Sequence, residues 1–599
     1  MRIKTFMFTV VVLGCGVRPT AAQPAWSGPF VRAWSLDGAP AAPLARSFGV
    51  GADLDQDGRD DIVLGNEPSY CGHGAIAAFR GLNGFPLWQV IGPLGSPSCL
   101  TQPPPGCAQT YLGHKRVKLV DLDGDQASDV LASGWGRCHA SWLIGPNAYG
   151  SLGGSIWGFR GVDGTPLFEV IAPAVAWSSV DGTGGYGWSF DGGEDVTGDG
   201  LPDVVGAAYG FALPGEGIYR GAIFGTPQMG STPFAVFPGV KVGDFPGGSP
   251  PGDGAIEFLD DVDGDGVMDF LASSASFYLG SLPPDASYVP KVGIVRLHSG
   301  ATFQVINSAQ GTAANDGFGH WIGSFPDIDG DGFRDFFTSV RAHAYISLIP
   351  PLAQQRVEVR SGADFSLIRT IFFVDGALAA QNPYEREIGP SVAGDVDGDG
   401  VPEVVLPSCG SQNCVIRVVS LGTGITVHQW VTPSGPYDYW MGSAGGDLNG
   451  DGLSDIVLVN MSASSGGPGT PIVGHVEAWL AQNMKLVTRP ALGNQAVFAV
   501  HMPKWPNRPY RLLFSQGTAP PVVLGPYVIP LALDAVFSAS LWNWFGAVLD
   551  GSGKGSFAVT IPNSPALSGM TFYASGIAVD SASPFGIAAV LTPVKVDIP

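Results

Sequence analysis

The sequence predicts an all-β fold, made of a long repeated region and a different C-terminal domain. Glycine and proline contribute 87 and 50 of the 599 residues, and both residues destabilise helix interiors. Short apolar runs are separated by turn residues along the whole chain, which is typical of many short strands. An acidic motif of nine residues occurs seven times, and a repeat at such spacing indicates a modular architecture.

The composition limits the class of partner. Hydrophobic residues make up 45% of the chain, which is enough for a packed core. The net charge is −22, and a surface this negative argues against nucleic acid or an anionic lipid surface as the partner. After the first residues, no apolar stretch is long enough to span a bilayer as a helix. We therefore expect no transmembrane segment.

Residues 1–22 have the pattern of a signal peptide. Arg2 and Lys4 precede an apolar run over residues 6–13, and Thr20-Ala21-Ala22 supplies small residues for cleavage. This order of charge, apolar run and small residues is typical of secretory signals. The sequence therefore predicts a secreted or cell-surface protein. In a second interpretation the segment ends at Cys15 and leaves a lipid anchor on that cysteine.

Six cysteines follow the predicted signal peptide, and an even number in an exported protein favours disulfide bonds. Cys409 and Cys414 flank a four-residue loop, so we expect them to pair. The other four are Cys71, Cys99, Cys107 and Cys138. Four cysteines allow three connectivities. The Pro-rich turn between residues 99 and 107 favours a bond between Cys99 and Cys107, which leaves Cys71 to pair with Cys138. None has the spacing of a zinc site.

The repeated motif reads Asp-x-Asp-x-Asp-Gly-x-x-Asp in its fullest form, with 52 to 74 residues between successive starts. Positions 1, 3, 5 and 9 carry side-chain oxygens and hold half of the 52 acidic residues of the chain. The predicted metal ligands are Asp53, Asp55, Asp57 and Asp61; Asp121, Asp123, Asp125 and Asp129; Asp195, Thr197, Asp199 and Asp203; Asp261, Asp263, Asp265 and Asp269; Asp327, Asp329, Asp331 and Asp335; Asp395, Asp397, Asp399 and Glu403; Asp447, Asn449, Asp451 and Asp455.

These oxygens suit Ca²⁺, which takes six to eight oxygen ligands in a flexible geometry, better than Mg²⁺, which requires a strict octahedron. The spacing is similar to the first half of an EF-hand loop, but the last acid comes at position 9 and a β-type run follows it. Asp-Gly pairs are also good turn formers. A single copy of the motif would therefore be explained as a turn, without a metal ion. Carboxylates this close repel one another unless a cation lies among them, so the repeated motif predicts several structural Ca²⁺ ions.

Besides Glu403, which keeps a carboxylate, three positions depart from the motif. Thr197 and Asn449 replace acids with neutral oxygens, so we expect the third and seventh sites to be weaker. Gln126 stands where the other copies have the turn glycine, and a side chain at that position strains the bend.

Other features recur in phase with the acidic motif. Aromatic-glycine pairs such as Phe48-Gly49 and Phe318-Gly319 precede it, and a strand ending in a glycine turn, such as Phe79-Arg80-Gly81, follows it. Each repeat therefore reads as four antiparallel strands, which is the blade of a β-propeller, and seven motifs predict seven blades. We expect the strand from Phe30 to Leu36 to close the ring against the last blade, near residues 475–480.

The aromatic-glycine pair, the acidic motif and the glycine-turn strand together resemble the FG-GAP repeat of integrin α-subunit propellers and of many bacterial secreted proteins. The resemblance covers residues 25–482. It implies a seven-bladed β-propeller with Ca²⁺ held in hairpins at one face and the other face left for a partner, as in cell adhesion.

Residues 486–599 have a different composition, with four acidic and six basic residues. Apolar or alternating runs, among them 537–542, are separated by Gly, Pro and Asn, and predict a C-terminal β-sandwich. The stretch 562–573 resembles a terminal β-domain of large secreted bacterial proteins. Trp542, Trp544 and Phe545 are candidates for a sugar platform, although core packing is the favoured interpretation.

No catalytic residue is predicted, because the sequence lacks a GxSxG elbow, an HExxH helix and a P-loop. We therefore expect an exported calcium-binding propeller that acts as a binding or adhesion module for an extracellular protein or glycan. One alternative is a secreted polysaccharide lyase or glycoside hydrolase on the same scaffold, and another is an architectural surface component. The enzyme would need acids outside the motif, such as Glu169, Glu216, Asp244, Glu257 or Asp438, and the sequence singles out none of them.

Overall fold

The computed structural model describes residues 26–27, 30–38, 47–66, 74–92, 112–134, 154–171, 185–211, 220–227, 233–241, 244–247, 255–277, 291–313, 316–340, 355–373, 389–409, 413–433, 440–441, 445–460, 474–488, 490–524, 527–543 and 545–599. The predicted signal peptide, Cys15 and the cysteines at 71, 99, 107 and 138 lie outside these residues. Within these residues, no helix has the length and apolar character needed to cross a membrane.

The described residues from 47 to 433 form six antiparallel sheets of four strands, and in each sheet every strand pairs with the next one along the chain. The first sheet contains β3 (Ser47–Ala52), β4 (Asp61–Asn66), β5 (Ala75–Phe79) and β6 (Pro86–Ile91); the second β7 (Leu112–Val120), β8 (Asp129–Gly134), β9 (Ser155–Phe159) and β10 (Pro166–Ile171); the third β11 (Tyr186–Glu194), β12 (Asp203–Ala208), β13 (Ala222–Thr226) and β14 (Ala235–Pro238). The fourth contains β15 (Ile256–Phe258), β16 (Phe270–Ser274), β17 (Ile294–His298) and β18 (Val305–Gln310); the fifth β19 (Phe318–Phe325), β20 (Asp335–Val340), β21 (Arg356–Arg360) and β22 (Leu367–Phe372); the sixth β23 (Ser391–Gly394), β24 (Glu403–Cys409), β25 (Asn413–Ser420) and β26 (Thr426–Pro433).

The seventh sheet joins the two ends of this region. Its strands are β1 (Trp26–Ser27), β2 (Phe30–Asp37), β27 (Trp440–Met441), β28 (Gly445–Gly446), β29 (Asp455–Asn460) and β30 (His475–Ala481). Strand β2 runs antiparallel to β30, with Phe30 opposite Ala481 and Asp37 opposite His475. The predicted pairing of the first strand with the last repeat is therefore confirmed.

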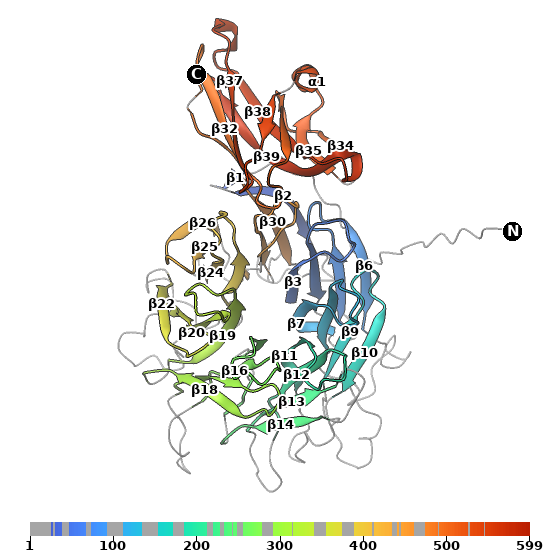
Figure 1. The fold of residues 1–599 in the computed structure, drawn as a ribbon, viewed down its shortest axis with the longest axis vertical. Coiled ribbons are helices and arrows are strands. Elements are labelled where there is room, and N and C mark those ends of the chain that lie inside the picture. Colours follow the sequence, from blue (N-terminus) through green and yellow to red (C-terminus); the bar gives the residue numbers. More distant parts are fainter. Residues whose placement is uncertain are drawn as a thin grey trace, which may run out of the picture.

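Successive sheets lie side by side around a common centre (Figure 1). The first strands of the sheets are in contact in the order β3, β7, β11, β15, β19, β23 and β28, and β28 in turn contacts β3. Glycines allow the backbones to approach closely here, since a Cβ on Gly445 would lie 1.5 Å from the carbonyl oxygen of Ala393. The all-β fold predicted from composition is confirmed.

Each sheet packs both of its faces against neighbouring sheets. Alternate residues of a strand point to opposite faces, so Ile62 and Leu64 of β4 enter the core shared with the seventh sheet, and Val63 enters the core shared with the second. In the part of the chain that is described, seven apolar clusters separate successive sheets, and one of them lies between the seventh sheet and the first. Burial on both faces explains why the second strands read as continuous apolar runs.

The predicted pair Cys409 and Cys414 lies across a hairpin. Strands β24 and β25 place these two residues directly opposite each other. That register is the one a disulfide between them needs, and the bond itself stays a prediction.

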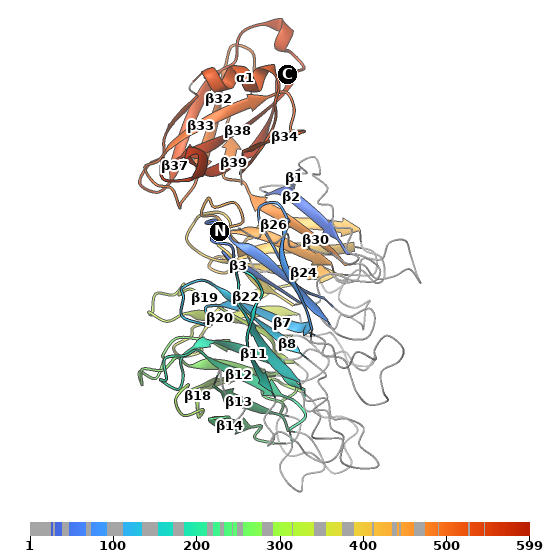
Figure 2. The same ribbon diagram turned by 90° about the vertical axis from the view of Figure 1, so that its right-hand side faces the viewer.

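The C-terminal domain lies beyond the sheet that contains β2 and β30 (Figure 2). One of its sheets has β31 (Met484–Leu486), β32 (Gln495–His501) and β37 (Lys554–Thr560), and a second has β33 (Pro509–Ser515), β36 (Gly546–Val548), β38 (Thr571–Val579) and β39 (Ile587–Asp597). Strands β34 (Pro521–Leu524) and β35 (Tyr527–Ala532) form a hairpin, and 3-10 turns cover Pro565–Leu567 and Pro584–Gly586. The two larger sheets share one apolar core, as expected for sheets packed face to face.

One predicted strand of this domain is wrong. Residues 537–542 belong to helix α1 (Ala535–Trp542), whose N-terminus is capped by Asp534 through a bond from the Phe537 N–H. Such a cap satisfies an otherwise unpaired backbone donor and favours the helix. Trp542 at its end is 90% exposed, so core packing is also wrong for this residue. Phe545 does pack against the core, edge-on to Phe514, and Trp544 lies outside the described residues.

Trp34 of β2 provides a test of the strand pairing between the two ends of the repeated region. Its side chain is 2% exposed, and its indole N–H donates to the carbonyl oxygen of Gly81 in the first sheet. Replacing a buried tryptophan with alanine costs about 3–5 kcal/mol, so Trp34→Ala should lower the free energy of unfolding by that amount in guanidinium denaturation. The exposed Trp542 gives the matched control, because Trp542→Ala should change it by less than about 0.5 kcal/mol. Equal effects of the two substitutions would contradict the packing described here.

Candidate metal-binding loops

The seven acidic motifs are seven loops between paired strands: they connect the first and second strands of six sheets, and β28 and β29 of the seventh, which we also call its first and second strands. We call them loops 1 to 7 in chain order, and number their residues 1 to 9 as in the sequence motif; they cover 53–61, 121–129, 195–203, 261–269, 327–335, 395–403 and 447–455. Position 9 lies at or directly before the start of the second strand in every loop. The loops therefore all lie at the same end of their sheets.

Backbone hydrogen bonds to the carboxylates shape each loop. In loop 6, Asp395 accepts from the N–H groups of Gly398, Asp399 and Gly400 at 2.7, 3.2 and 2.8 Å. Asp399 accepts from the N–H of Val401 at 2.8 Å. Gly398 and Gly400 have φ values of +79° and +91°, which glycine adopts without strain. The Asp-Gly pattern is thus what this tight turn requires.

Loop 2 has a glutamine at the turn position where the other loops have glycine, and the sequence predicts strain there. Gln126 occupies the turn position with φ of +67°, a conformation that costs energy for a residue with a Cβ. Its N–H still donates to Asp121, so the loop keeps the same turn despite the strain.

The carboxylate at position 9 ties each loop to the sheet. It is at most 1% exposed in all seven loops. In loop 5, Asp335 accepts from the N–H of Ile328 within the loop and from the N–H of Gly362, which follows the third strand. Equivalent bonds from the third-strand side reach position 9 in loops 1, 2, 4 and 7.

Two position-9 carboxylates lack this second bond. Oδ1 of Asp203 and Oε1 of Glu403 are buried and have no hydrogen-bond partner among the described residues, and the same is true of Oδ1 of Asp55 at position 3 of loop 1. A buried carboxylate oxygen without a partner is costly. A cation in the loop would supply the missing interaction, so these oxygens fit a metal site.

Burial and like charge raise the pKa values of the position-9 acids. Burial is the largest cause for Asp61, whose pKa rises to about 7, and the neighbouring Asp55 raises it further. Burial likewise raises the pKa of Glu403 to about 8, and the three acids of its own loop add to the shift. For Asp129 and Asp335 the pKa rises to about 6 for the same first reason. The loops thus hold more negative charge than their surroundings stabilise.

Five loops bring three acids close enough to share one cation. One carboxylate oxygen from each acid lies within 4.8 Å of the other two; the groups are Asp53, Asp55 and Asp57; Asp121, Asp123 and Asp129; Asp261, Asp263 and Asp265; Asp327, Asp329 and Asp335; and Asp395, Asp397 and Asp399. Loops 3 and 7, where Thr197 and Asn449 replace an acid, form no such group among the described residues. These are the two loops expected to be weaker from the sequence.

The residue directly before the glycine turn of the third strand also reaches the loops, a contact that sequence reasoning missed. In loops 1 and 2 this residue is arginine, and Arg80 contacts Asp55 at 2.6 Å while Arg160 contacts Asp123 at 3.2 Å. In loop 5 it is serine, and the Ser361 hydroxyl donates to Asp331 at 2.8 Å. The recurring residue before glycine in the sequence was the available signal. Arg80 and Arg160 therefore place a cation against the acids of loops 1 and 2, whereas Ser361 places a neutral hydroxyl against those of loop 5.

Two of the acids outside the loops, Asp244 and Glu257, lie in ion pairs. Asp244 is bound by both terminal nitrogens of Arg296 in a buried ion pair. Burial favours a raised pKa for Glu257, but Arg116 and Lys118 outweigh it and lower the pKa to about 2. A carboxyl group with that pKa is not a general acid at neutral pH. Glu216 and Asp438 lie outside the described residues.

Asp335 tests the role of position 9 as the link between loop and sheet. Asn at this position has one acceptor oxygen for two backbone donors, so one buried N–H loses its partner. Asp335→Asn should therefore cost about 1–3 kcal/mol of stability, measured as the unfolding midpoint in denaturant. Asp364 is an exposed turn residue whose carboxylate accepts from Ser366, and Asn is tolerated at such turns. A loss as large in the control Asp364→Asn would show that charge alone, and not the two bonds, explains the effect.

Comparison with known proteins agrees with this geometry over part of the chain. Residues 395–458 match the FG-GAP-like repeat family, and this segment contains loops 6 and 7 and strands β24 to β26. A search of curated proteins finds no match. One repeat of the FG-GAP-like type is therefore shown, within an all-β chain.

Proposed function

We propose that this chain is an exported, seven-bladed β-propeller, stabilised by Ca²⁺, which acts as a binding module for an extracellular protein or glycan. The observation that carries the proposal is the set of five loops in which three acids converge within 4.8 Å. An FG-GAP-like repeat in residues 395–458 supports a propeller-type binding module.

The packing of the sheets supports seven blades in a closed ring. Every sheet shares an apolar cluster with the next one, and the cluster containing Trp34, Ile62 and Val457 lies between the seventh sheet and the first. The contact between β28 and β3 completes the cycle of first strands. A ring of this kind removes the exposed edges of its inner strands.

The metal has a structural role in this proposal. A cation would offset the repulsion within each loop and bind the buried oxygens that lack a partner. We expect the strongest sites in loops 4, 5 and 6, weaker ones in loops 1 and 2, where Arg80 and Arg160 compete, and the weakest in loop 3. Since the loops connect first and second strands, ion binding there would stabilise the blades without forming a catalytic centre.

The binding face is proposed at the opposite end of the blades. The acidic loops and the short turns after the third strands lie at one end, so the connections from second to third strand leave from the other. These connections are long in sequence, running for example from Gly134 to Ser155 and from Val340 to Arg356. Long connections on a rigid scaffold are where binding residues concentrate.

Calcium should raise the stability of the protein. At free Ca²⁺ a hundredfold above the dissociation constant, each occupied loop contributes about 2.7 kcal/mol. We therefore expect a higher melting temperature in Ca²⁺ than in EGTA, and a calorimetric titration that shows more than one bound ion. Mg²⁺ at the same concentration is the control and should have a smaller effect. An identical melting temperature in Ca²⁺ and EGTA would contradict the structural metal.

A binding screen tests the module itself. The full chain, loaded with Ca²⁺, should bind at least one member of a panel of immobilised extracellular glycans and matrix proteins, and should release no product from soluble polysaccharides. Release of unsaturated or reducing ends from a polysaccharide would instead support the lyase or hydrolase. Absence of binding across the panel would count against the binding module.

A further inference from the structure

The two domains are joined by a very short connection that is partly buried. Strand β30 ends at Ala481 and β31 begins at Met484, so only Gln482 and Asn483 lie between them. Asn483 is 1% exposed. Its Nδ2 donates to Oδ2 of Asp451 at 2.6 Å and to the carbonyl oxygen of Val590 at 3.2 Å. Its Oδ1 accepts from the N–H and the hydroxyl of Thr592. One side chain thus connects loop 7 to strand β39.

A lysine of the C-terminal domain contacts the same loop. The ammonium of Lys504 lies 3.6 Å from Oδ2 of Asp447 and donates to the carbonyl oxygen of Gly58 at 2.8 Å. Its backbone N–H donates to the carbonyl oxygen of Asp451. The neighbouring Trp505 donates its indole N–H to the carbonyl oxygen of Gly450 at 2.6 Å. Loop 7 therefore receives one cation and several donors from the other domain.

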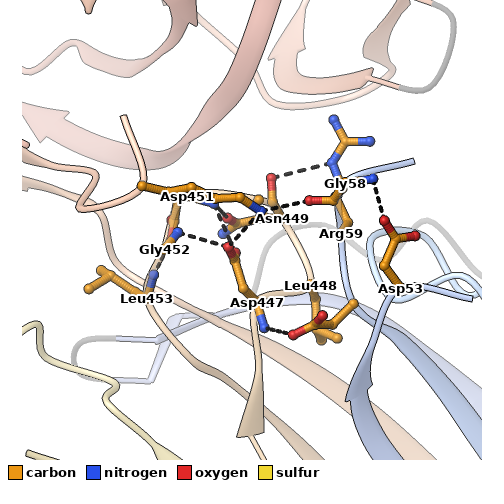
Figure 3. A network of polar contacts seen from close by, with 12 residues as sticks. Asp53, Gly58, Arg59, Asp447, Leu448, Asn449, Asp451, Gly452 and Leu453 are labelled. Carbon is orange, nitrogen blue, oxygen red and sulfur yellow. Dashed lines mark hydrogen bonds and ion pairs between the residues drawn. The ribbon is translucent and has the colours of Figure 1, made fainter. Parts of the chain in front are cut away.

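These contacts bury loop 7. The acid at position 5 is exposed in the other six loops, but Asp451 in loop 7 is 0% exposed. Gly452 leaves the space for this approach, because a Cβ there would lie 2.5 Å from the backbone nitrogen of Lys504. Figure 3 shows how Asp447, Asn449 and Asp451 turn toward one another within the loop.

Loop 1 contributes a second cation to the same junction. Arg59 is 5% exposed and donates to the carbonyl oxygen of Asn449 (Figure 3). It also pairs with Asp57 at 3.3 Å. Its guanidinium lies over the ring of Tyr527 in the C-terminal domain, 4.5 Å from the centroid. Two side-chain cations, one from each domain, thus lie among the acids of loops 1 and 7.

We propose that loop 7 is the docking site of the C-terminal domain, in which the ammonium of Lys504, beside Asp447, supplies the positive charge that the proposed metal ions would supply in other loops. Asn483 holds the connection between the two domains in place, and Arg59 joins loop 1 to the docked domain. The three acids of loop 7 do not bring carboxylate oxygens within 4.8 Å of one another, unlike three acids in each of five other loops. The two domains therefore form one unit, and their docking does not depend on Ca²⁺.

Hydrogen exchange of the full chain, read by mass spectrometry, tests this role of Lys504. Lys504→Met removes the ammonium but keeps the apolar stem. Exchange should become at least about threefold faster in peptides covering 447–455 and 501–508, as expected for loss of a partly exposed ion pair together with a hydrogen bond. Peptides covering loop 5, at 327–335, should not change.

The matched control is Lys595→Met, since Lys595 pairs with Asp597 within the same domain and lies about as exposed as Lys504. Lys595→Met should leave the exchange rates of both peptides unchanged. If Lys504→Met prevents folding, Trp505→Phe removes the bond to Gly450 and should accelerate the same two peptides. Unchanged exchange in the variant that folds would overturn the proposal.

Removal of Ca²⁺ separates this proposal from the metal sites of the other loops. In EGTA the wild-type protein should exchange faster in loops 4, 5 and 6, and at an unchanged rate in loop 7. Faster exchange in loop 7 by the same factor would overturn the role of Lys504. No change in any loop would remove the metal proposal and with it the comparison of Lys504 to a metal ion, and the docking contact would then be decided by Lys504→Met alone.

Discussion

Burial of a carboxylate at the start of each second strand is the constraint on which this structure depends. The seven position-9 acids are at most 1% exposed, and a buried charge is tolerated only when it is paired or hydrogen-bonded. Backbone donors from the loop and from the third strand meet part of this need. The remaining loop acids increase the negative charge, so each loop also needs a positive partner.

The chain provides that partner in different ways. Arg80 and Arg160 supply it within loops 1 and 2, and Lys504 supplies it to loop 7 from the other domain. Loop 3 has less charge because of Thr197. Loops 4 and 6 group three acids each and have no ion pair with a lysine or arginine side chain in the described structure. We infer that one repeated loop has been used for two purposes, as a cation site and as a docking surface.

The sequence was sufficient to predict the repeated part of the fold. The motif and the apolar runs after it gave the order of strands in each sheet, and the strand near Phe30 was correctly paired with the end of the repeated region. Contacts between distant segments were not predictable, because Lys504 and Asn483 belong to no motif and act only through the docking of two domains. Helix α1 was missed since its residues are apolar and mostly exposed, so neither strand nor helix periodicity marks them. The capping residue Asp534 was the only local signal.

Anomalous diffraction from crystals of the full chain grown with Ca²⁺, and with a lanthanide as a stronger scatterer, tests the central claim most directly. Peaks should lie among the acids of loops 4, 5 and 6, with weaker peaks in loops 1 and 2 and none in loop 7. Crystals without a peak in any loop would contradict the claim that external cations offset the buried charge. A peak in loop 7 as strong as that in loop 5 would contradict the assignment of Lys504 as its cation.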